Sequence, residues 1–193
     1  QAIDTAEAGD IVSLAGMSKA TVADTIADQS VQDPIPAQPI DPPTITVTFG
    51  INDSPLAGRD GKKVQSRVIR DRLLKECESN VAIKMVDTPG GEAFDVSGRG
   101  ELQMGVLIEN MRREGFELSI SRPRVIYKDV EGVKNEPVEE VTIDVDEEFS
   151  GAVIEKLSAR KGEMVDLKSS GSGKTRIVSL VPSRGLIGYH SEF

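Results

Sequence analysis

The feature that most constrains the fold is an order of strand-like and helix-like segments that runs through once and then begins again. Residues 44–49 alternate threonine with isoleucine, valine and phenylalanine, the pattern of a half-buried strand. Residues 62–77 place apolar side chains mostly four apart, which predicts an amphipathic helix. Further segments are predicted in the order strand, strand, helix and strand, at residues 81–86, 93–96, 101–114 and 116–120. Gly115 stands where a left-handed cap would end the second helix.

The same order begins again after residue 125. The sequence predicts a strand, a helix, two strands and the start of a second helix, at residues 138–145, 151–161, 163–167, 176–181 and from 183 onward. No closing strand precedes residue 193. The predicted fold class is therefore α+β, with two ferredoxin-like βαββαβ units, of which the second is truncated. We expect the sheet edge of that second unit to be left unpaired or to be completed by another chain.

The segment before residue 44 does not follow this order. Its one clear apolar strand is predicted at Ile11–Ala15. Because a solitary strand cannot bury itself, the other strands of its sheet or barrel would lie upstream of Gln1. Five of the ten prolines fall between residues 33 and 43, and they predict an extended linker. We therefore expect domain boundaries that give the segments 1–32, 33–43, 44–125 and 126–193.

Composition excludes several classes of protein and of site. No stretch approaches the roughly 18 consecutive apolar residues of a membrane helix, so no membrane partner is expected. The single cysteine, Cys77, has no internal disulfide partner and is interpreted as a small buried hydrophobe. No cluster of cysteine and histidine is spaced to bind a metal, and the lone His190 supports no specific role. The chain opens without a methionine or a secretory signal, as a fragment would, and we expect a cytoplasmic setting.

Two short motifs suggest nucleotide binding, but each lacks its required neighbours. Residues 170–175 end like a P-loop, yet Lys168 stands where the first glycine is needed, and a strand-like segment follows. Residues 87–90, Asp-Thr-Pro-Gly, copy a D-x-x-G element without a phosphate-binding loop upstream. Both motifs are interpreted as hairpin turns. The acidic run at 144–148 lacks the glycine and terminal glutamate of a calcium loop. We therefore predict no catalytic, cofactor-binding or metal-binding residue in this chain.

Basic residues carry the remaining functional signal. The net charge of −9 argues against indiscriminate binding to nucleic acid, but cations and acids are unevenly distributed along the chain. Arginine suits bidentate phosphate contacts, while an aromatic content of 4% argues against base stacking. We therefore predict recognition of the shape and backbone of folded RNA. The candidate RNA-contacting residues are Arg59, Lys62, Lys63, Arg67, Arg112, Arg113, Arg122, Arg124, Lys156, Arg160, Lys161 and Arg184.

Four strings in this sequence resemble one protein family, in the order and spacing that the family shows. Residues 8–16 resemble the end of the β-barrel domain of translational GTPases. Residues 96–103, Val-Ser-Gly-Arg-Gly-Glu-Leu-Gln, resemble the G-x-G-E-L-H element in the third domain of elongation-factor-G-like proteins. Gln103 stands where many relatives have histidine. Residues 107–118 and 182–188 narrow the resemblance to the TypA/BipA family, and similarity runs through the whole chain.

The resemblance implies an assignment for each segment. Residues 1–32 would end barrel domain II, residues 44–125 would be domain III, and residues 126–193 would be most of domain V. GTP and magnesium would be bound by a GTPase domain that precedes Gln1, so this fragment would hold no cofactor and would not be an enzyme.

The resemblance also implies a function. The implied partner is the ribosome, through ribosomal RNA and ribosomal proteins. The implied role is docking that couples GTP hydrolysis to translation or to ribosome assembly under stress. The alternative is a ferredoxin-like regulatory module that binds a small metabolite and dimerises.

Overall fold

A computed structural model describes residues 3–17, 20, 22, 24–37, 40–169 and 171–193. The chain divides into two units, residues 1–39 and 40–193, and the division falls within the proline-rich segment. The described residues of the first unit form no helix or strand. The strand predicted at Ile11–Ala15 is therefore wrong. The side chain of Ile11 is fully exposed, because the described part of this unit offers no strand to pair with it.

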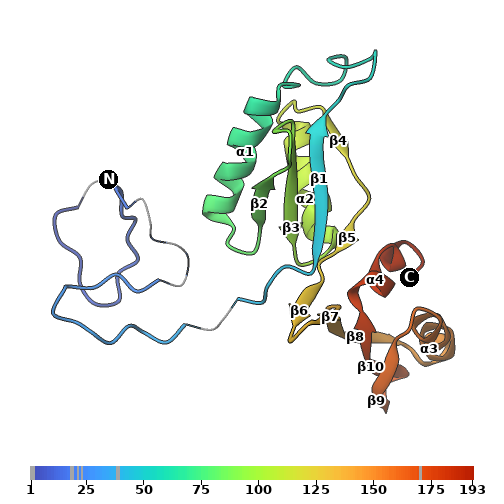
Figure 1. Cartoon of the computed structure of the whole chain (residues 1–193). Coiled ribbons are helices and arrows are strands. Elements are labelled where there is room, and N and C mark those ends of the chain that lie inside the picture. The colour runs from blue at the N-terminus through green and yellow to red at the C-terminus, as the bar shows by residue number, and fades with distance from the viewer. Residues whose placement is uncertain (1–2, 18–19, 21, 23, 38–39, 170) are drawn as a thin grey trace. The chain divides into compact units, whose positions relative to one another are not determined.

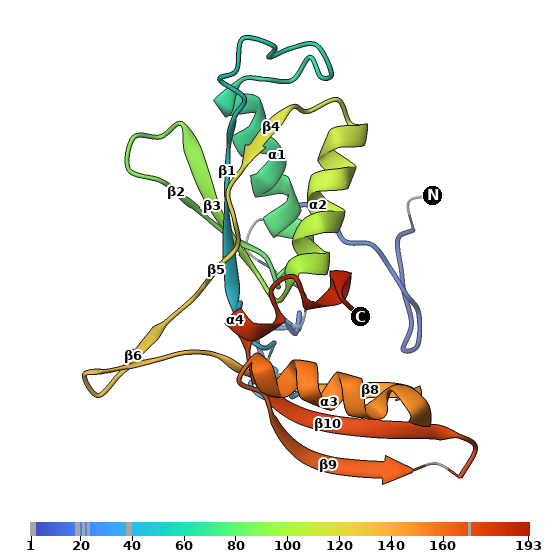
Figure 2. The ribbon, with the colours of Figure 1, turned by 90° about the vertical axis from the view of Figure 1, so that its right-hand side faces the viewer.

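Residues 44–125 form the first lobe of the second unit, and this lobe contains the complete predicted order of elements. They are β1 (Ile45–Ile51), α1 (Ser66–Ser79), β2 (Lys84–Asp87), β3 (Ala93–Gly98), α2 (Glu101–Arg113) and β4 (Leu118–Ile120). The strands lie in the order β2-β3-β1-β4, and every neighbouring pair is antiparallel. A short strand, β5 (Arg124–Val125), also pairs with β1. This is the ferredoxin-like arrangement, with both helices on one face of the sheet (Figure 1 and Figure 2).

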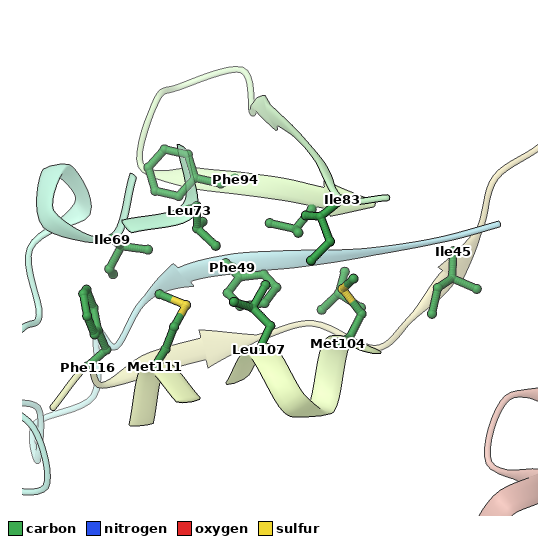
Figure 3. Packing of buried hydrophobic residues seen from close by; sticks show 12 residues of the cluster. Ile45, Phe49, Ile69, Leu73, Ile83, Phe94, Met104, Leu107, Met111 and Phe116 are labelled. Atoms are coloured by element: carbon green, nitrogen blue, oxygen red, sulfur yellow. The ribbon is translucent and has the colours of Figure 1, made fainter. Parts of the chain in front are cut away.

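The core of the first lobe lies between the sheet and its two helices (Figure 3). Alternation along β1 turns Ile45, Val47 and Phe49 toward the helices, where all three are buried. The apolar stripes of the two helices contribute the buried side chains of Ile69, Leu73, Met104, Leu107 and Met111. The predicted periodicities of two and of about 3.6 residues therefore correspond to faces that meet in one core.

Two elements of this lobe begin three or four residues later than predicted. Helix α1 begins at Ser66 rather than Lys62, because residues 61–63 are held against the end of α2 instead. The N–H of Lys63 donates to the carbonyl of Gly115 (3.1 Å), and the N–H of Glu117 donates to the carbonyl of Lys63 (3.3 Å). Strand β2 begins at Lys84 rather than at residue 81, because a turn across residues 80–83 precedes it.

Residues 126–193 contain the second lobe, which has only part of the same order. Its main elements are β8 (Val138–Asp146), η1 (Glu147–Phe149), α3 (Ser150–Ala159), β9 (Glu163–Ser169) and β10 (Lys174–Pro182). The strands lie in the order β8-β10-β9, with both pairs antiparallel. The core is small and consists of Val153, Leu157, Ile177, Val181 and Tyr189. As predicted for a truncated unit, one edge of β8 has no strand partner in the described residues.

The second helix predicted for this lobe is a single turn, α4 (Ser183–Leu186). It ends there because Ile187 has a ψ of 121° and Gly188 a left-handed φ of 75°. The short helix η2 (Tyr189–Ser191) follows and places the Tyr189 ring in the core.

A hairpin between the lobes was not predicted from the sequence. It consists of β6 (Lys128–Val130) and β7 (Val133–Asn135), joined by Glu131 and Gly132. Both joining residues have positive φ, at 55° and 79°, as in a type I′ turn. A Glu-Gly pair is a weaker turn signal than Asn-Gly or Asp-Gly, and the flanking strands are short, so the local pattern does not reveal the hairpin.

Candidate nucleic-acid interface

Half of the twelve predicted RNA-contacting cations form ion pairs with carboxylates of this chain. Arg112 and Arg113, at the end of α2, share the carboxylate of Glu109 at 2.7 and 2.8 Å. These two hydrogen bonds lower the pKa of Glu109 to about 2. The other pairs are Arg124–Asp95 (3.1 Å), Lys156–Glu192 (3.8 Å), Arg160–Glu192 (2.7 Å) and Arg184–Glu136 (2.7 Å). A carboxylate this close offsets part of the charge that a cation presents to a phosphate.

Arg160 is built into the second lobe. One of its terminal nitrogens donates to the carbonyls of Gly185 (2.8 Å) and Ile187 (3.2 Å), and the other to Glu192. The guanidinium carbon lies 5.3 Å from the centre of the Tyr189 ring. Only 22% of the side chain is exposed. Through these contacts Arg160 stabilises the α4–η2 segment. Its part in RNA binding stays a prediction.

The open face of the first sheet, opposite the helices, is polar. The hydroxyl of Thr48 donates to Asp95 (2.6 Å), and Arg124 donates to both of these side chains at 3.0 and 3.1 Å. The hydroxyls of Thr46 and Ser97 are hydrogen-bonded at 2.7 Å. This face therefore carries hydroxyls and an ion pair where base-stacking sheets carry aromatic rings.

Four of the other cations lie within nine residues at one end of the first lobe, and we call them the basic corner: Arg59, Lys62, Lys63 and Arg67. All four are exposed, and none has an ion pair in the part of the chain that the structure describes. The ammonium group of Lys63 lies 4.6 Å from the centre of the Phe116 ring. Their charges therefore remain available to an external anion. Arg122 and Lys161 are also exposed and without an ion pair among the described residues, but they stand singly.

A single carboxylate organises the loop that leads into the basic corner. The side chain of Glu117 accepts backbone N–H groups from Gly58 (3.0 Å), Asp60 (3.2 Å) and Gly61 (3.0 Å). The side-chain amide of Asn52 donates to the same carboxylate. These hydrogen bonds, that of Gly61 first, lower the pKa of Glu117. A charged acceptor of this kind holds its donors more strongly than a neutral one.

Gly61 brings the loop close to the backbone of the α2–β4 connection. A Cβ atom at this position would lie 2.7 Å from the carbonyl oxygen of Gly115 and 3.0 Å from the carbonyl carbon of Phe116. Only glycine therefore allows the loop to approach this closely.

The two nucleotide-like motifs are hairpin turns, as predicted. Of residues 170–175, residue 170 lies outside the described residues. Gly171 and Gly173 have positive φ, at 68° and 78°, in the connection between β9 and β10. Asp87 ends β2, and the N–H of Gly91 donates to the carbonyl of Thr88 (3.0 Å) to close the turn into β3. Asp87 is paired with Arg70 at 2.8 Å, which lowers the pKa of the carboxyl.

The remaining candidate residues show no chemistry of their own. Cys77 is half-buried and packs against the first core, where burial raises the pKa of its thiol. His190 is exposed in η2. No group of three or more potential metal ligands gathers anywhere in the described residues. Within those residues there is also no helix of the length and apolarity that crossing a membrane requires.

A groove of about 500 Å³ runs beside β8, and Gly100, Glu101 and Leu102 at the start of α2 in the first lobe also line it. Its apolar wall includes Val141, Ile143, Leu186 and Phe193. Tyr189 also lines it, with a buried hydroxyl that has no hydrogen-bond partner among the described residues. The groove follows the edge where the fourth strand of a complete ferredoxin-like sheet would pair.

Sequence reasoning missed Glu117 and Asn52, which shape the loop without carrying the charge that an RNA would bind. Glu117 stands in the segment 116–120 predicted as a strand, where a glutamate is typical of a solvent-facing position. The one available signal was the pair Gly58 and Gly61, which marks this segment as a loop.

Comparison with known proteins gives a consistent result. The C-terminal part of the chain, residues 133–193, matches the family profile described as elongation factor G C-terminus. The chain is 50% identical over 98% of its length to the large ribosomal subunit assembly factor BipA of Haemophilus influenzae. It is 50% identical over 99% of its length to the protein of that name from Bacillus subtilis, and 49% identical over 98% to that of Escherichia coli K12.

The match covers only part of each relative. The chain spans 31% of the length of these relatives. A crystal structure from Thermus thermophilus aligns with a TM-score of 0.45 at 12% identity, over 81% of this chain and 38% of that one, which is too weak to add to the assignment. The identity along nearly the whole chain, the matching C-terminal profile and the ferredoxin-like architecture together show that this chain belongs to the TypA/BipA family of elongation-factor-G-like proteins.

Proposed function

We propose that this chain is a ribosome-docking portion of a TypA/BipA-like translational GTPase. It would act in the cytoplasm, contact ribosomal RNA and ribosomal proteins, and relay the GTP state of another domain to the position of the factor. GTP and magnesium would be bound in that other domain. The names of the relatives support a role in assembly of the large ribosomal subunit, and we extend the proposal to ribosome assembly and translation under stress.

The basic corner is the observation that carries this proposal. Four exposed cations lie within nine residues and form no ion pair among the described residues. Three of them precede α1, on or directly after the loop that Glu117 holds, and Arg67 lies in the first turn of α1. By contrast, Arg112 and Arg113 share Glu109, and Arg160 is bonded within its own lobe. An RNA backbone needs uncompensated positive charge, so the basic corner suits it best.

Sedimentation with purified ribosomes tests the proposal. The chain would be pelleted with ribosomes at salt concentrations from about 50 to 200 mM, where phosphate contacts lose affinity most visibly. A variant with Arg59→Gln and Lys62→Gln should bind more weakly. The slope of log K against log salt should also fall by about 1.4 to 1.8, because each lost phosphate contact removes about 0.7 to 0.9 from it.

A matched control removes the same charge from the paired arginines. Arg112→Gln with Arg113→Gln should change the slope by less than half as much, because Glu109 already offsets these cations. Equal effects from the two double variants would contradict the choice of surface. No sedimentation of the unaltered chain even at low salt would contradict docking by this chain.

The groove beside β8 favours a second candidate function, a regulatory module that binds a small metabolite and dimerises. Its volume of about 500 Å³ and its apolar lining suit a small organic molecule. Calorimetry with amino acids and nucleotides would test it, together with the molar mass of the chain in solution. Heat of binding and a dimer, without binding to ribosomes, would favour this function over docking.

A further inference from the structure

The clamp made by Glu117 acts on the backbone at the very positions that carry the basic corner. The carboxylate holds the N–H groups of Gly58 and Asp60, the residues on either side of Arg59. It also holds the N–H of Gly61, which directly precedes Lys62. The backbone of Lys63 is in turn hydrogen-bonded to Gly115 and to Glu117.

We propose that Glu117 is the positioning residue of an RNA-binding surface, and that by fixing this loop it makes the first lobe select folded RNA over flexible single strands. The inference rests on the proposed function, since it assumes that the basic corner meets RNA. It goes further because it names a residue that controls the choice between folded and single-stranded RNA without contacting the RNA.

The physical reason for the selection is preorganisation. A folded RNA presents phosphates at fixed spacings, so cations held at a matching spacing bind it without losing further conformational freedom. A flexible strand can adapt its phosphates to cations in any arrangement, and it gains little from a rigid loop. The salt slope depends on the number of cations that contact phosphates, which a substitution of Glu117 leaves unchanged, and the loss of one carboxylate charge is matched in the control variant.

The geometry also sets what a substitution would do. In Glu117→Gln, the side chain keeps its length but replaces one acceptor oxygen by an N–H₂ group. The three backbone N–H groups all donate to one carboxylate oxygen, so a glutamine oxygen in that place would hold them only as a neutral, weaker acceptor. The N–H₂ group would then face the side-chain amide of Asn52, so the clamp would be loosened. The side chain of Glu117 also receives the amide of Asn52, so Asn52→Ala removes one donor and leaves the three backbone donors in place.

The experiment compares two RNA probes at one salt concentration and then across salt. Binding of a stem-loop RNA and of poly(U) to the full chain would be measured by fluorescence anisotropy. For Glu117→Gln we expect stem-loop affinity to fall about five- to tenfold and poly(U) affinity to change by less than about twofold, with unchanged salt slopes. Hydrogen exchange at the amides of residues 58, 60 and 61 would show whether the loop is released.

Glu78→Gln is the matched control. Glu78 is exposed on α1 and accepts no backbone N–H group of the loop. Its substitution by glutamine removes the same negative charge as Glu117→Gln. It should leave the ratio of the two affinities unchanged. Should Glu117→Gln fail to fold, as judged by its thermal melt, Asn52→Ala should shift the same ratio in the same direction by a smaller factor.

The outcomes separate this inference from the docking proposal. If the unaltered chain binds and Glu117→Gln releases the loop amides but changes both affinities equally or neither, the positioning role is wrong and docking stands. A fall in stem-loop affinity with a shallower salt slope would also overturn it, because it would mean that cations were lost rather than misplaced. If the unaltered chain binds neither RNA nor ribosomes, the docking proposal fails, and the positioning role fails with it.

Discussion

The two lobes share one order of elements, but their hydrophobic cores differ greatly in size. The first lobe pairs four strands in its main sheet and covers one face with two full helices, which gives a core of twelve buried residues. The second pairs three strands under one full helix and buries five residues. In the first lobe, α2 supplies three of these twelve residues directly, Met104, Leu107 and Met111, and the second lobe has no helix of that length in the same place. We expect the first lobe to be the more resistant to unfolding.

The largest loss of stability is expected when a large side chain at the centre of the first core is truncated. Phe49 lies in β1 with no exposed surface and belongs to the core cluster that residues of both helices complete (Figure 3). Phe49→Ala should reduce the free energy of unfolding of this lobe by about 3–5 kcal/mol, through lost burial and the cavity left behind. Hydrogen exchange, followed separately for peptides of each lobe, should then show the first lobe opening at a rate near that of the second.

The exposed residue Leu102 provides the control for this change. Leu102→Ala removes a similar apolar side chain that is already 73% exposed, so exchange in the first lobe should hardly change. If Phe49→Ala leaves the order of opening and the exchange rates of both lobes unaltered, the difference in core size does not decide their stability.

A smaller loss of stability is expected when a methyl group is added where two backbone segments of the second lobe lie close together. A Cβ atom on Gly185 would lie 2.5 Å from the carbonyl oxygen of Arg160, which is backbone and cannot turn aside. Gly185→Ala should therefore destabilise the second lobe by about 1–3 kcal/mol and widen the gap between the lobes. Urea unfolding monitored by lobe-specific exchange measures this gap.

Gly151→Ala is the companion variant, because its added methyl group would meet nothing within 4 Å. It lies in α3 of the same lobe. Destabilisation of the two variants by equal amounts would show that the close approach at Gly185 is not the cause.

A substitution that increases the free energy of unfolding is expected in the first lobe. Gly105 lies inside α2, and a Cβ atom there would meet nothing within 4 Å. Gly105→Ala should stabilise this lobe by about 0.5–1 kcal/mol, because alanine loses less backbone entropy in a helix. The urea midpoint of the first lobe should rise while that of the second stays constant, and a fall would show that α2 is packed more tightly at this point than the contacts indicate.

The smallest effect concerns pH. The pKa of Glu109 is lowered to about 2 by hydrogen bonds from Arg112 and Arg113. A carboxyl with a lowered folded-state pKa stabilises the protein above its unfolded pKa, and this contribution is lost as pH falls from its ordinary value of 4.5 toward 2. The effect should be slight because the group is exposed to solvent.

Comparison of urea midpoints at pH 6 and pH 3 measures this dependence. Glu109→Gln should reduce the acid-induced loss in the first lobe and leave the second lobe unchanged. An identical pH dependence with and without Glu109 would mean that the two ion pairs contribute nothing.

Much of the fold followed from local pattern, and the exceptions have physical causes. The alternation in β1 and the helical stripes of α1 and α2 sufficed because burial of one face decides these elements. The start of α1 was missed because residues 61–63 bond to the α2–β4 connection, which local pattern does not show. The one-turn length of α4 depended on the conformation of Gly188, and the strand predicted at Ile11–Ala15 depended on partners that the described chain does not provide.

The candidate site was predictable only as a set of charges. Arginine and lysine content placed the basic residues, but the sequence could not show that Arg112 and Arg113 share Glu109 while Arg59 and Lys62 have no such partner among the described residues. That distinction arises from tertiary distances. The role of Glu117 could not be predicted from local sequence, because its partners are backbone N–H groups more than 50 residues away along the chain.

The open edge of β8 has a consequence for how this chain behaves at high concentration. Glu147 and Pro137 bond toward β10, so the alternate residues Val138, Glu140, Thr142 and Asp144 direct their N–H and carbonyl groups outward. Such an edge is a template for self-association. Of its two acidic residues, Asp144 is paired with Arg176 at 2.7 Å, so Glu140 and the net charge of −9 are what oppose the approach of a second copy. The chain should therefore precipitate most readily in mild acid, where this net charge is lost.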